Sequence, residues 1–330
     1  MTGDNSGEVI LRVANLCTEF RSDESTVRAV DDVSFELHRG EVLGIVGESG
    51  CGKSASCMSV MRLLPEPHGR IHSGRILFNG QDLAALNEKQ MRKIRGNRIA
   101  MIFQDPMTCL NPYLTVADQL SEVGILHLGK SRKQATADAI ALLRRVGLPD
   151  AERQVKSYPH ELSGGMRQRV MIAMALLCDP EILIADEPTT ALDVTTQAQI
   201  LDLLLELREE RGLSVILITH DLGVVSETCD RVLVMYAGRV VESAPAQALF
   251  AQPQHPYTLD LLRSVPRIDT RSAKLESIGG LPPRLDGDGF TACSYLPRCR
   301  LAVAQCRVGE PALVGTTRAR RCVLPVGDVQ

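Results

Sequence analysis

The octapeptide "GESGCGKS", Gly47 to Ser54, is the most informative stretch of this chain. It fits the pattern G-x-x-x-x-G-K-[ST] and lies between a compact apolar strand, Glu41–Gly47, and a predicted helix, Lys53–Leu64. In such a loop the glycines let backbone N–H groups turn toward an anion, and the helix N-terminus adds partial positive charge. A chance glycine-rich turn would not need both flanking elements. We therefore predict that this loop binds the phosphates of a nucleotide. Its expected contact residues are Gly47, Ser49, Gly50, Cys51, Gly52, Lys53, Ser54 and Ala55.

A second motif, formed by two acidic residues, follows downstream at the end of the apolar run "ILIADE", Ile182 to Glu187. Together with the Ser54 hydroxyl, the Asp186 carboxylate is placed to hold Mg²⁺, directly or through water. Glu187 stands one residue further, where a base or a water-positioning group is needed. An acidic pair after a strand is by itself more often a solvated strand end, and only the upstream phosphate loop favours the functional interpretation.

The remaining pattern predicts an α/β protein. Two alternating runs predict antiparallel strands, and further strands alternate with helices, which implies a largely parallel sheet with right-handed crossovers. A helical stretch near residues 114–148 interrupts this alternation, and a hairpin is expected to turn at Ala237–Gly238. Beyond residue 251 proline and glycine become frequent, so a smaller module begins there. The predicted strands are Val9–Leu16, Val27–Leu37, 74–83, 97–104, Ile182–Asp186, Ser214–His220 and 231–243.

Composition argues against two classes of function. The chain has 330 residues, 44% of them hydrophobic and 23% charged, with a formal net charge of −3, so it has no basic stripe for nucleic acid. The longest apolar runs, such as Val170–Cys178, are about half as long as a membrane span requires. The N-terminal residues lack the basic and apolar regions of a secretory signal, so we expect a cytoplasmic protein with reduced thiols.

Five further motifs carry a family resemblance. "LSGGMRQRVMIAMAL", Leu162 to Leu176, resembles the signature motif of ABC-type ATPases. Gln104 in "FQDP" resembles the Q-loop of that family, Asp193 in "TALD" its D-loop, and His220 in "ITHDL" its switch histidine. Phe20 stands where such proteins have an adenine-stacking aromatic, although a core position fits it equally well. The resemblance covers about residues 8–251.

This resemblance implies a fold and a mechanism. The fold is a P-loop NTPase with a RecA-like core, an antiparallel β subdomain and a helical subdomain near residues 105–180. ATP with Mg²⁺ is held by the phosphate loop of one chain and covered by the signature motif of a second chain. Glu187 polarises the attacking water, His220 holds the γ-phosphate, and Gln104 contacts Mg²⁺ or the water. The covering residues are Ser163, Gly164 and Gly165, next to Asp193.

Two segments narrow the resemblance. "YPHELSGGMRQRVMIAMAL" and "HPYTLDLLRSVP", His255 to Pro266, resemble the ATPases of dipeptide, oligopeptide and nickel importers. The second segment is similar to a C-terminal extension of that group, which here would span residues 252–330. The resemblance implies a peripheral subunit on the cytoplasmic side of the cell membrane. Its partners would be a second, homologous but different ATPase, two membrane permeases and an extracytoplasmic solute-binding protein, without nucleic acid.

The extension contains four cysteines spaced C-x5-C-x6-C-x15-C. In some members of the importer group such a tail carries a [4Fe–4S] cluster, and the resemblance puts its ligands at these positions. Four thiolates would also hold Zn²⁺, and unliganded reduced thiols are the third possibility. The spacing lacks the C-x2-C pair typical of zinc ribbons, which favours the cluster. These cysteines are Cys293, Cys299, Cys306 and Cys322.

Three other functions remain open from the sequence. The first is a soluble ABC ATPase that acts on nucleic acid or ribosomes, which would share the same ATP motifs. The second is an iron–sulfur redox sensor, in which the cysteine-containing tail would carry the main function. The third is an importer of nickel rather than peptide. The solute is selected by the binding protein and the permeases, so this chain does not determine it.

Overall fold

The computed structural model describes residues 7–105, 109–188, 193–264, 278–283, 285 and 290–329. Its contacts divide the chain into two compact units. Unit 1 comprises Met1–His38, Val42–Ala84 and Thr219–Gln330, and unit 2 comprises Arg39–Glu41 and Ala85–Ile218. Among the described residues no helix is both long and apolar enough to span a membrane.

Unit 1 contains a four-stranded antiparallel sheet of order β2-β1-β4-β5. The predicted antiparallel pair is confirmed, but β1 continues five residues beyond its predicted end because register shifts let pairing resume after Leu16. The alternating apolar residues of β1 and β2 are buried, as a half-buried sheet requires. The strands are β1 Val9–Arg21, β2 Thr26–His38, β4 Gly69–Phe78 and β5 Gln81–Asp82.

A second set of strands in unit 1 flanks the phosphate loop. β3, Val42–Val46, is buried along its whole length and runs parallel to β9, Arg231–Tyr236. β9 pairs antiparallel with β10, Arg239–Pro245, and β10 with β11, Ala319–Arg320. The predicted hairpin turn at Ala237–Gly238 is confirmed, and both of its residues have positive φ (48° and 78°), as a type I′ turn requires.

The helix after the phosphate loop, α1, spans Lys53–Met61 and ends three residues before the predicted Leu64. Arg62 takes a left-handed conformation (φ 50°), and its backbone N–H donates to the carbonyls of Met58 and Ser59. The amide of Leu63 also turns back to the Met58 carbonyl at 2.9 Å. A proline follows shortly after, which could not continue the helix.

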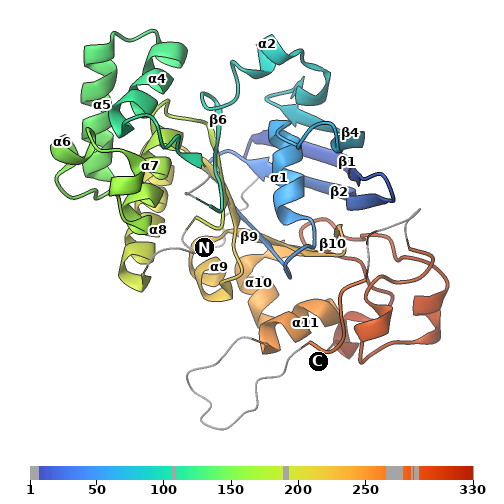
Figure 1. Ribbon diagram of the computed structural model, residues 1–330. Helices are drawn as coiled ribbons and strands as arrows, with labels where there is room; N and C mark the ends of the chain where they lie inside the picture. Colours follow the sequence, from blue (N-terminus) through green and yellow to red (C-terminus); the bar gives the residue numbers. More distant parts are fainter. Residues whose placement is uncertain are drawn as a thin grey trace. The chain divides into compact units, whose positions relative to one another are not determined.

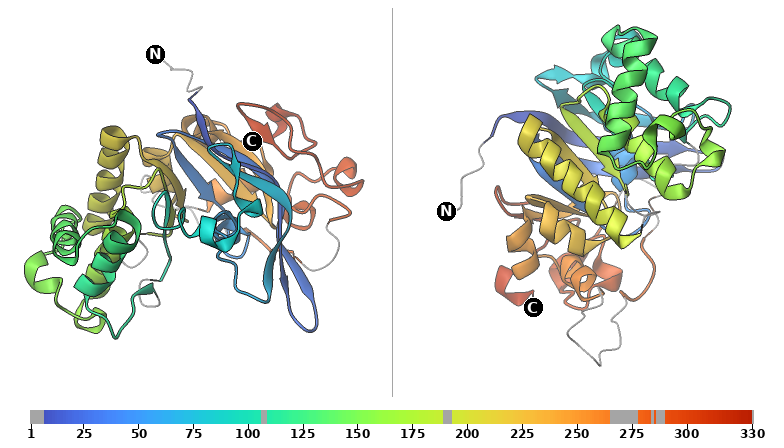
Figure 2. Two further views of the ribbon diagram at one scale, coloured as in Figure 1. Left: turned by 90° about the horizontal axis from the view of Figure 1, so that it is seen from above. Right: turned by 90° about the vertical axis from the view of Figure 1, so that its left-hand side faces the viewer.

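The rest of unit 1 is made of short helices and turns, and the last part of the chain is largely irregular (Figure 2). Pro256 occupies the first turn of α11, where a proline needs no backbone donor, and the His255 side chain accepts a hydrogen bond from the Tyr257 amide. The helices are α9 Leu222–Thr228, α10 Ala246–Ala251 and α11 Pro256–Arg263. The 3₁₀ turns are η3 Leu296–Arg298, η4 Ala304–Arg307 and η5 Val326–Asp328, with η1 Leu83–Ala85 at the boundary between the units.

Unit 2 combines three parallel strands with helices (Figure 1). The strands lie in the order β8-β7-β6, with β6 Ile99–Ile102, β7 Ile182–Asp186 and β8 Ser214–Ile218. All residues of the three strands are buried, which explains their continuous apolar sequences. The short elements α2, α6 and η2 span Glu88–Met91, Ala151–Gln154 and Pro159–Glu161.

The predicted helical stretch of unit 2 is confirmed and consists of two helices, α4 Val116–Leu128 and α5 Arg132–Arg145. Thr115 and Ser131 cap their N-termini through side-chain oxygens, and Gly129 ends α4 in the left-handed region. Gly124 allows a close approach of the two helices, since an added Cβ would lie 3.0 Å from the Ala135 Cβ. Two further helices follow, α7 Gly164–Leu176 and α8 Val194–Arg211.

Candidate functional site

In unit 1 the loop Gly47–Ser54 connects β3 to α1, as the sequence predicted. Its glycines are required by geometry. Gly47 (φ 149°) and Gly52 (φ 102°) lie in conformations that side chains disfavour, and an added Cβ would lie 2.2 Å from the Met235 carbonyl oxygen or 2.3 Å from that of Ala29. Gly52 is also the N-cap of α1 and brings no side chain, so the first amides of the helix are not covered by their own cap.

Lys53 is the buried cation of this loop, with an exposed fraction of 7%. Its Nζ donates to the carbonyl oxygens of Gly47 at 2.8 Å and of Glu48 at 2.9 Å. The backbone of the loop therefore already holds the Lys53 ammonium at the place where a phosphate would bind. Ser54 is half-buried at the start of α1, Ala55 is buried, and Ser49 and Gly50 are exposed.

Cys51 occupies the fifth position of the loop and is 5% exposed. Burial raises the pKa of its thiol, and the nearby Lys53 ammonium only partly offsets this. The side chain therefore stays a neutral thiol at physiological pH and acts as a small apolar residue under the loop.

In unit 2 the structure brings together two of the predicted catalytic residues. The Gln104 amide Nε2 donates to the Glu187 carboxylate Oε2 at 3.1 Å. Asp186 ends β7 and is 5% exposed, whereas Glu187 is half-buried and leaves the strand in the left-handed conformation (φ 49°). Its amide donates to the Ile218 carbonyl at 2.9 Å. The two successive carboxylates thus differ in burial and in backbone conformation, which suits two different tasks.

The signature motif begins α7. Ser163 is exposed at the N-cap and accepts a hydrogen bond from the Met166 amide at 3.3 Å. Gly164 is exposed too, and an added Cβ would meet nothing within 4 Å, while Gly165 is half-buried. The N-terminus of this 13-residue helix therefore faces open space, which is the arrangement that an external anion needs.

Asp193 caps the next helix, α8, by accepting from the Thr196 amide at 3.0 Å. Hydrogen bonds from Thr196 lower the pKa of this exposed carboxyl below its usual value. The neighbouring residues of the "TALD" motif lie outside the described residues.

Two further predicted residues lie in unit 1. Phe20 is half-buried on β1, opposite Val27 of β2 and Gly69 of β4, and its ring edge lies 3.1 Å from where a Cβ on Gly69 would stand. This position suits either of the two interpretations of Phe20. His220 is exposed directly before Asp221, whose side chain caps α9.

The four tail cysteines line one cavity of unit 1, together with His255, Pro256 and Tyr295. Burial raises the pKa of Cys293 to about 12 and of Cys299 to about 11, and it also raises that of Cys322. All ten cysteines are free thiols. Within the described residues no three histidine, cysteine or acidic side chains are grouped so as to hold a metal ion as they stand. The four cysteines that the sequence singled out therefore lie around one cavity.

Sequence reasoning missed one group of contacts to the phosphate loop. The Glu48 carboxylate pairs with Arg298, and the Glu48 amide donates to the Tyr257 hydroxyl at 2.9 Å. Tyr257 belongs to the "HPYT" segment, which the sequence indicated as a mark of family resemblance and not as part of the nucleotide site. No sequence pattern could reveal the pair with Arg298, because the two residues are separated by 250 positions.

These features define a P-loop nucleoside triphosphatase: the loop Gly47–Ser54 with its buried Lys53, the helix start without a side-chain cap, and the acidic pair Asp186 and Glu187. Comparison with known proteins makes this more specific. The family model for the ABC transporter matches residues 30–190, and the model for the oligopeptide/dipeptide transporter C-terminal region matches residues 241–306.

Relatives of known name align over nearly the whole chain. The dipeptide transport ATP-binding protein DppD of Bacillus subtilis is 53% identical over 299 residues, which cover 91% of this chain and 89% of that protein. The oligopeptide transport ATP-binding protein OppD of Salmonella typhimurium is 49% identical, covering 97% and 95%. This chain therefore belongs to the family of ABC transporter ATP-binding subunits, which hydrolyse ATP to power transport.

Solved structures support the same fold. The ATP-binding cassette MJ0796, described as a dimer in a post-hydrolysis state bound to ADP and Pi, has a TM-score of 0.66 at 29% identity. The match covers 72% of this chain and 98% of that one. The predicted fold class is thereby confirmed for the ATPase part, whereas the cysteine-containing extension has no counterpart in this comparison.

Proposed function

We propose that this chain is the ATPase subunit of an importer for di- or oligopeptides. One observation carries the proposal. The similarity to DppD and OppD is not confined to the ATP motifs but continues through the C-terminal region, at about half of all positions. The printed names of both relatives refer to peptide transport.

The residues of unit 1 would bind the ATP phosphates. Lys53 donates its ammonium protons, and the loop amides from Gly47 to Ala55 complete an anion cradle. Lys53 already has two carbonyl partners, so binding ATP exchanges one set of acceptors for another without moving a buried charge into solvent. Phe20 would stack on the adenine, and His220 would contact the γ-phosphate.

The residues of unit 2 would supply the acid–base chemistry. Mg²⁺ prefers oxygen ligands, so the Gln104 amide oxygen and the Asp186 carboxylate of unit 2 suit this ion, as does the Ser54 hydroxyl of unit 1. The ion would neutralise charge on the phosphates. Glu187 would accept the proton of the attacking water. The hydrogen bond from Gln104 Nε2 fixes one oxygen of this carboxylate at 3.1 Å, which would help to orient it toward the water.

The signature residues would act on a second chain. Ser163, Gly164 and Gly165 present a hydroxyl and unhindered amides at a helix N-terminus, so they would cover the γ-phosphate bound by a partner ATPase, with Asp193 at the same interface. Loss of the bridging phosphate charge after hydrolysis would let the pair reopen. We propose a homologous but different chain as this partner.

The assembly follows from the importer function. The ATPase part, residues 8–251, would dock through the helical subdomain near residues 105–180 on two membrane permeases, at the cytoplasmic side of the cell membrane. Residues 252–330 would form the extension. A solute-binding protein outside would deliver the peptide, and neither nucleic acid nor ribosomes would be involved.

A deletion strain tests the transported solute. Removal of the gene is expected to abolish uptake of labelled di- or oligopeptides, and the wild-type gene is expected to restore it. Nickel uptake is the matched control, since nickel is the alternative solute that the sequence leaves open. Unchanged peptide uptake with loss of nickel uptake would contradict the proposal, as would retention of the protein on ribosomes rather than at the membrane.

We further propose that the four tail thiols bind a [4Fe–4S] cluster, with Zn²⁺ as the alternative. The donor set fits, because Cys293, Cys299, Cys306 and Cys322 line one cavity whose wall also includes apolar residues. Thiolates are the ligands of such clusters. Burial raises the pKa values of Cys293 and Cys299, so binding would release protons from these thiols. The thiols would also have to draw together around the metal, because among the described residues no three such side chains are grouped to hold one.

Anaerobic purification tests this proposal. Iron and acid-labile sulfide are expected in equal amounts, and Cys306→Ser is expected to lower both because its thiol is 5% exposed in the cavity wall. Cys109→Ser is the matched control, since that thiol lies outside the tail and donates to the Asp105 carbonyl. Stoichiometric zinc without iron would reverse the assignment.

A further inference from the structure

Glu48, the second residue of the phosphate loop, is held from three sides. Its carbonyl accepts from Lys53 Nζ at 2.9 Å, and its amide donates to the Tyr257 hydroxyl at 2.9 Å. Its carboxylate accepts two hydrogen bonds from the Arg298 guanidinium, at 2.6 and 2.9 Å. Any displacement of Glu48 therefore shifts the carbonyl on which the phosphate-binding ammonium rests.

Arg298 is itself rigidly placed, with an exposed side-chain fraction of 3%. Besides Glu48, its guanidinium donates to the carbonyl oxygens of Gly279 at 2.8 Å and Ile278 at 3.3 Å. It also lies 5.7 Å from the centroid of the Tyr236 ring. Because the planar guanidinium makes two parallel hydrogen bonds to the Glu48 carboxylate, it fixes the direction of that carboxylate, which a single hydrogen bond would not do.

Three tyrosines hold the extension against the strand beside the loop. The ring centroids of Tyr236 and Tyr257 are 4.6 Å apart, and Tyr295 lies 5.1 and 5.3 Å from these two. The Tyr295 hydroxyl donates to Asp260 at 2.5 Å. Tyr236 immediately precedes the turn whose Gly238 amide donates to the Cys51 carbonyl at 3.0 Å. The cluster therefore joins α11, β9 and the loop.

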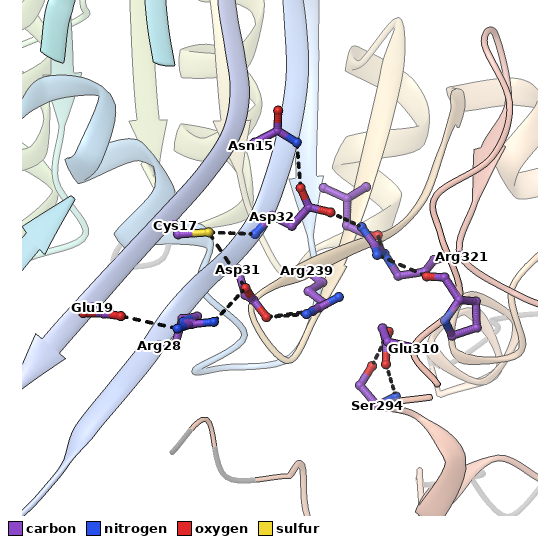
Figure 3. Close-up of polar contacts among 12 residues, drawn as sticks. Asn15, Cys17, Glu19, Arg28, Asp31, Asp32, Arg239, Ser294, Glu310 and Arg321 are labelled. Atoms are coloured by element: carbon purple, nitrogen blue, oxygen red, sulfur yellow. Dashed lines mark hydrogen bonds and ion pairs between the residues drawn. The ribbon is translucent and has the colours of Figure 1, made fainter. Parts of the chain in front are cut away.

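A second arginine anchors the extension elsewhere in unit 1 (Figure 3). Arg321 is 4% exposed and donates to the carbonyls of Val240 and Pro311, each at 3.1 Å. It also donates to Asp32 on β2 at 3.3 Å, and Asn15 on β1 holds the other oxygen of that carboxylate at 2.8 Å. The contacts of Arg298 and Arg321 together hold the C-terminal segment in a fixed position next to the phosphate loop.

The charge of Glu48 gives this geometry a consequence for ATP. A carboxylate in a phosphate-binding loop repels the polyanion that the loop must attract, unless a cation pairs with it. The Arg298 guanidinium supplies that cation and, by its two hydrogen bonds, also fixes the direction of the carboxylate. Arg298 therefore acts on the Glu48 carboxylate in two ways, by neutralising its charge and by fixing its orientation.

We propose that Arg298 is a positioning residue for the phosphate loop, which neutralises and orients Glu48 and thereby raises the affinity for ATP. The C-terminal extension would then be part of the nucleotide-binding apparatus. This inference depends on ATP binding alone and is independent of which solute is transported.

Nucleotide affinity measured with a fluorescent ATP analogue tests the proposal on the full chain. Arg298→Met is expected to raise the dissociation constant for the Mg²⁺ complex about tenfold, consistent with loss of a charged hydrogen-bonded pair. The rate at saturating ATP is expected to stay within about twofold, because the hydrolytic residues are unchanged. Arg298→Lys keeps the charge without the fork and is expected to lie between Arg298→Met and the wild type.

The Glu48→Gln change discriminates positioning from general damage. In the Arg298→Met background it removes the uncompensated carboxylate, so affinity is expected to recover to within about threefold of the wild type. The matched control is Arg307→Met, an exposed arginine of the same extension, which is expected to have no effect. Wild-type affinity in both Arg298 variants would overturn the proposal, and so would an affinity loss that Glu48→Gln does not relieve. Arg298→Lys serves as the test if the methionine variant does not fold.

Discussion

Lys53→Ala is expected to lower the affinity for Mg²⁺–ATP by at least about 100-fold, and hydrolysis with it. The Lys53 ammonium is buried and already anchored on two loop carbonyls, so alanine removes the cation and leaves Gly47 and Glu48 without that donor. Hydrogen bonds to charged groups contribute about 1.5–3 kcal/mol each. Because about 1.4 kcal/mol corresponds to a tenfold change, the loss of two phosphate contacts gives the stated magnitude.

Equilibrium binding of a fluorescent ATP analogue and release of phosphate measure this effect. Lys133→Ala is the matched control, because Lys133 is an exposed lysine on α5. Both variants are expected to unfold with the cooperativity of the wild type. Unchanged binding and turnover in Lys53→Ala would remove the loop from its assigned role, whatever the transported solute is.

Glu187→Gln is expected to bind Mg²⁺–ATP like the wild type and to hydrolyse it at least about 100-fold more slowly. A positioned general base contributes about 10²–10⁴-fold to a rate, and an amide cannot accept the proton of water at neutral pH. Glutamine has nearly the same shape, and its carbonyl oxygen can accept the hydrogen bond that Gln104 now donates to the carboxylate. The substitution therefore changes the chemistry while the local structure is retained.

Single-turnover phosphate release, combined with size-exclusion chromatography in the presence of ATP, measures both consequences. If hydrolysis opens the ATPase pair, the variant is expected to accumulate as an ATP-bound dimer with its natural partner. Glu209→Gln on α8 is the matched exposed control. Turnover within about twofold of the wild type would assign the proton transfer to another group.

Much of the local structure could be predicted. The strands around the phosphate loop and the hairpin turn at Ala237–Gly238 depend on short-range rules of burial and positive φ. Boundaries were less accurate. α1 ends at Met61 rather than Leu64 because Arg62 turns back on its own helix, a choice that apolar periodicity does not encode.

Contacts between distant segments could not be predicted in the same way. Cysteine spacing suggested a common site for four thiols, and they line one cavity, but the sequence could not say how closely their sulfur atoms approach. Gln104 and Glu187 were assigned separately by motif, and their hydrogen bond became visible only when β6 and β7 were paired.

By itself, the sequence determined that the chain binds ATP and belongs to the ABC ATPases, since phosphate binding is performed by backbone amides and a few side chains within one loop. Only the tertiary structure decided what surrounds that loop. Glu48 is paired with Arg298 across 250 positions, and Tyr257 supports its amide, because packing the extension against β9 brings these groups within hydrogen-bonding distance. Such pairs follow from the burial of whole segments, which no local pattern of residues specifies.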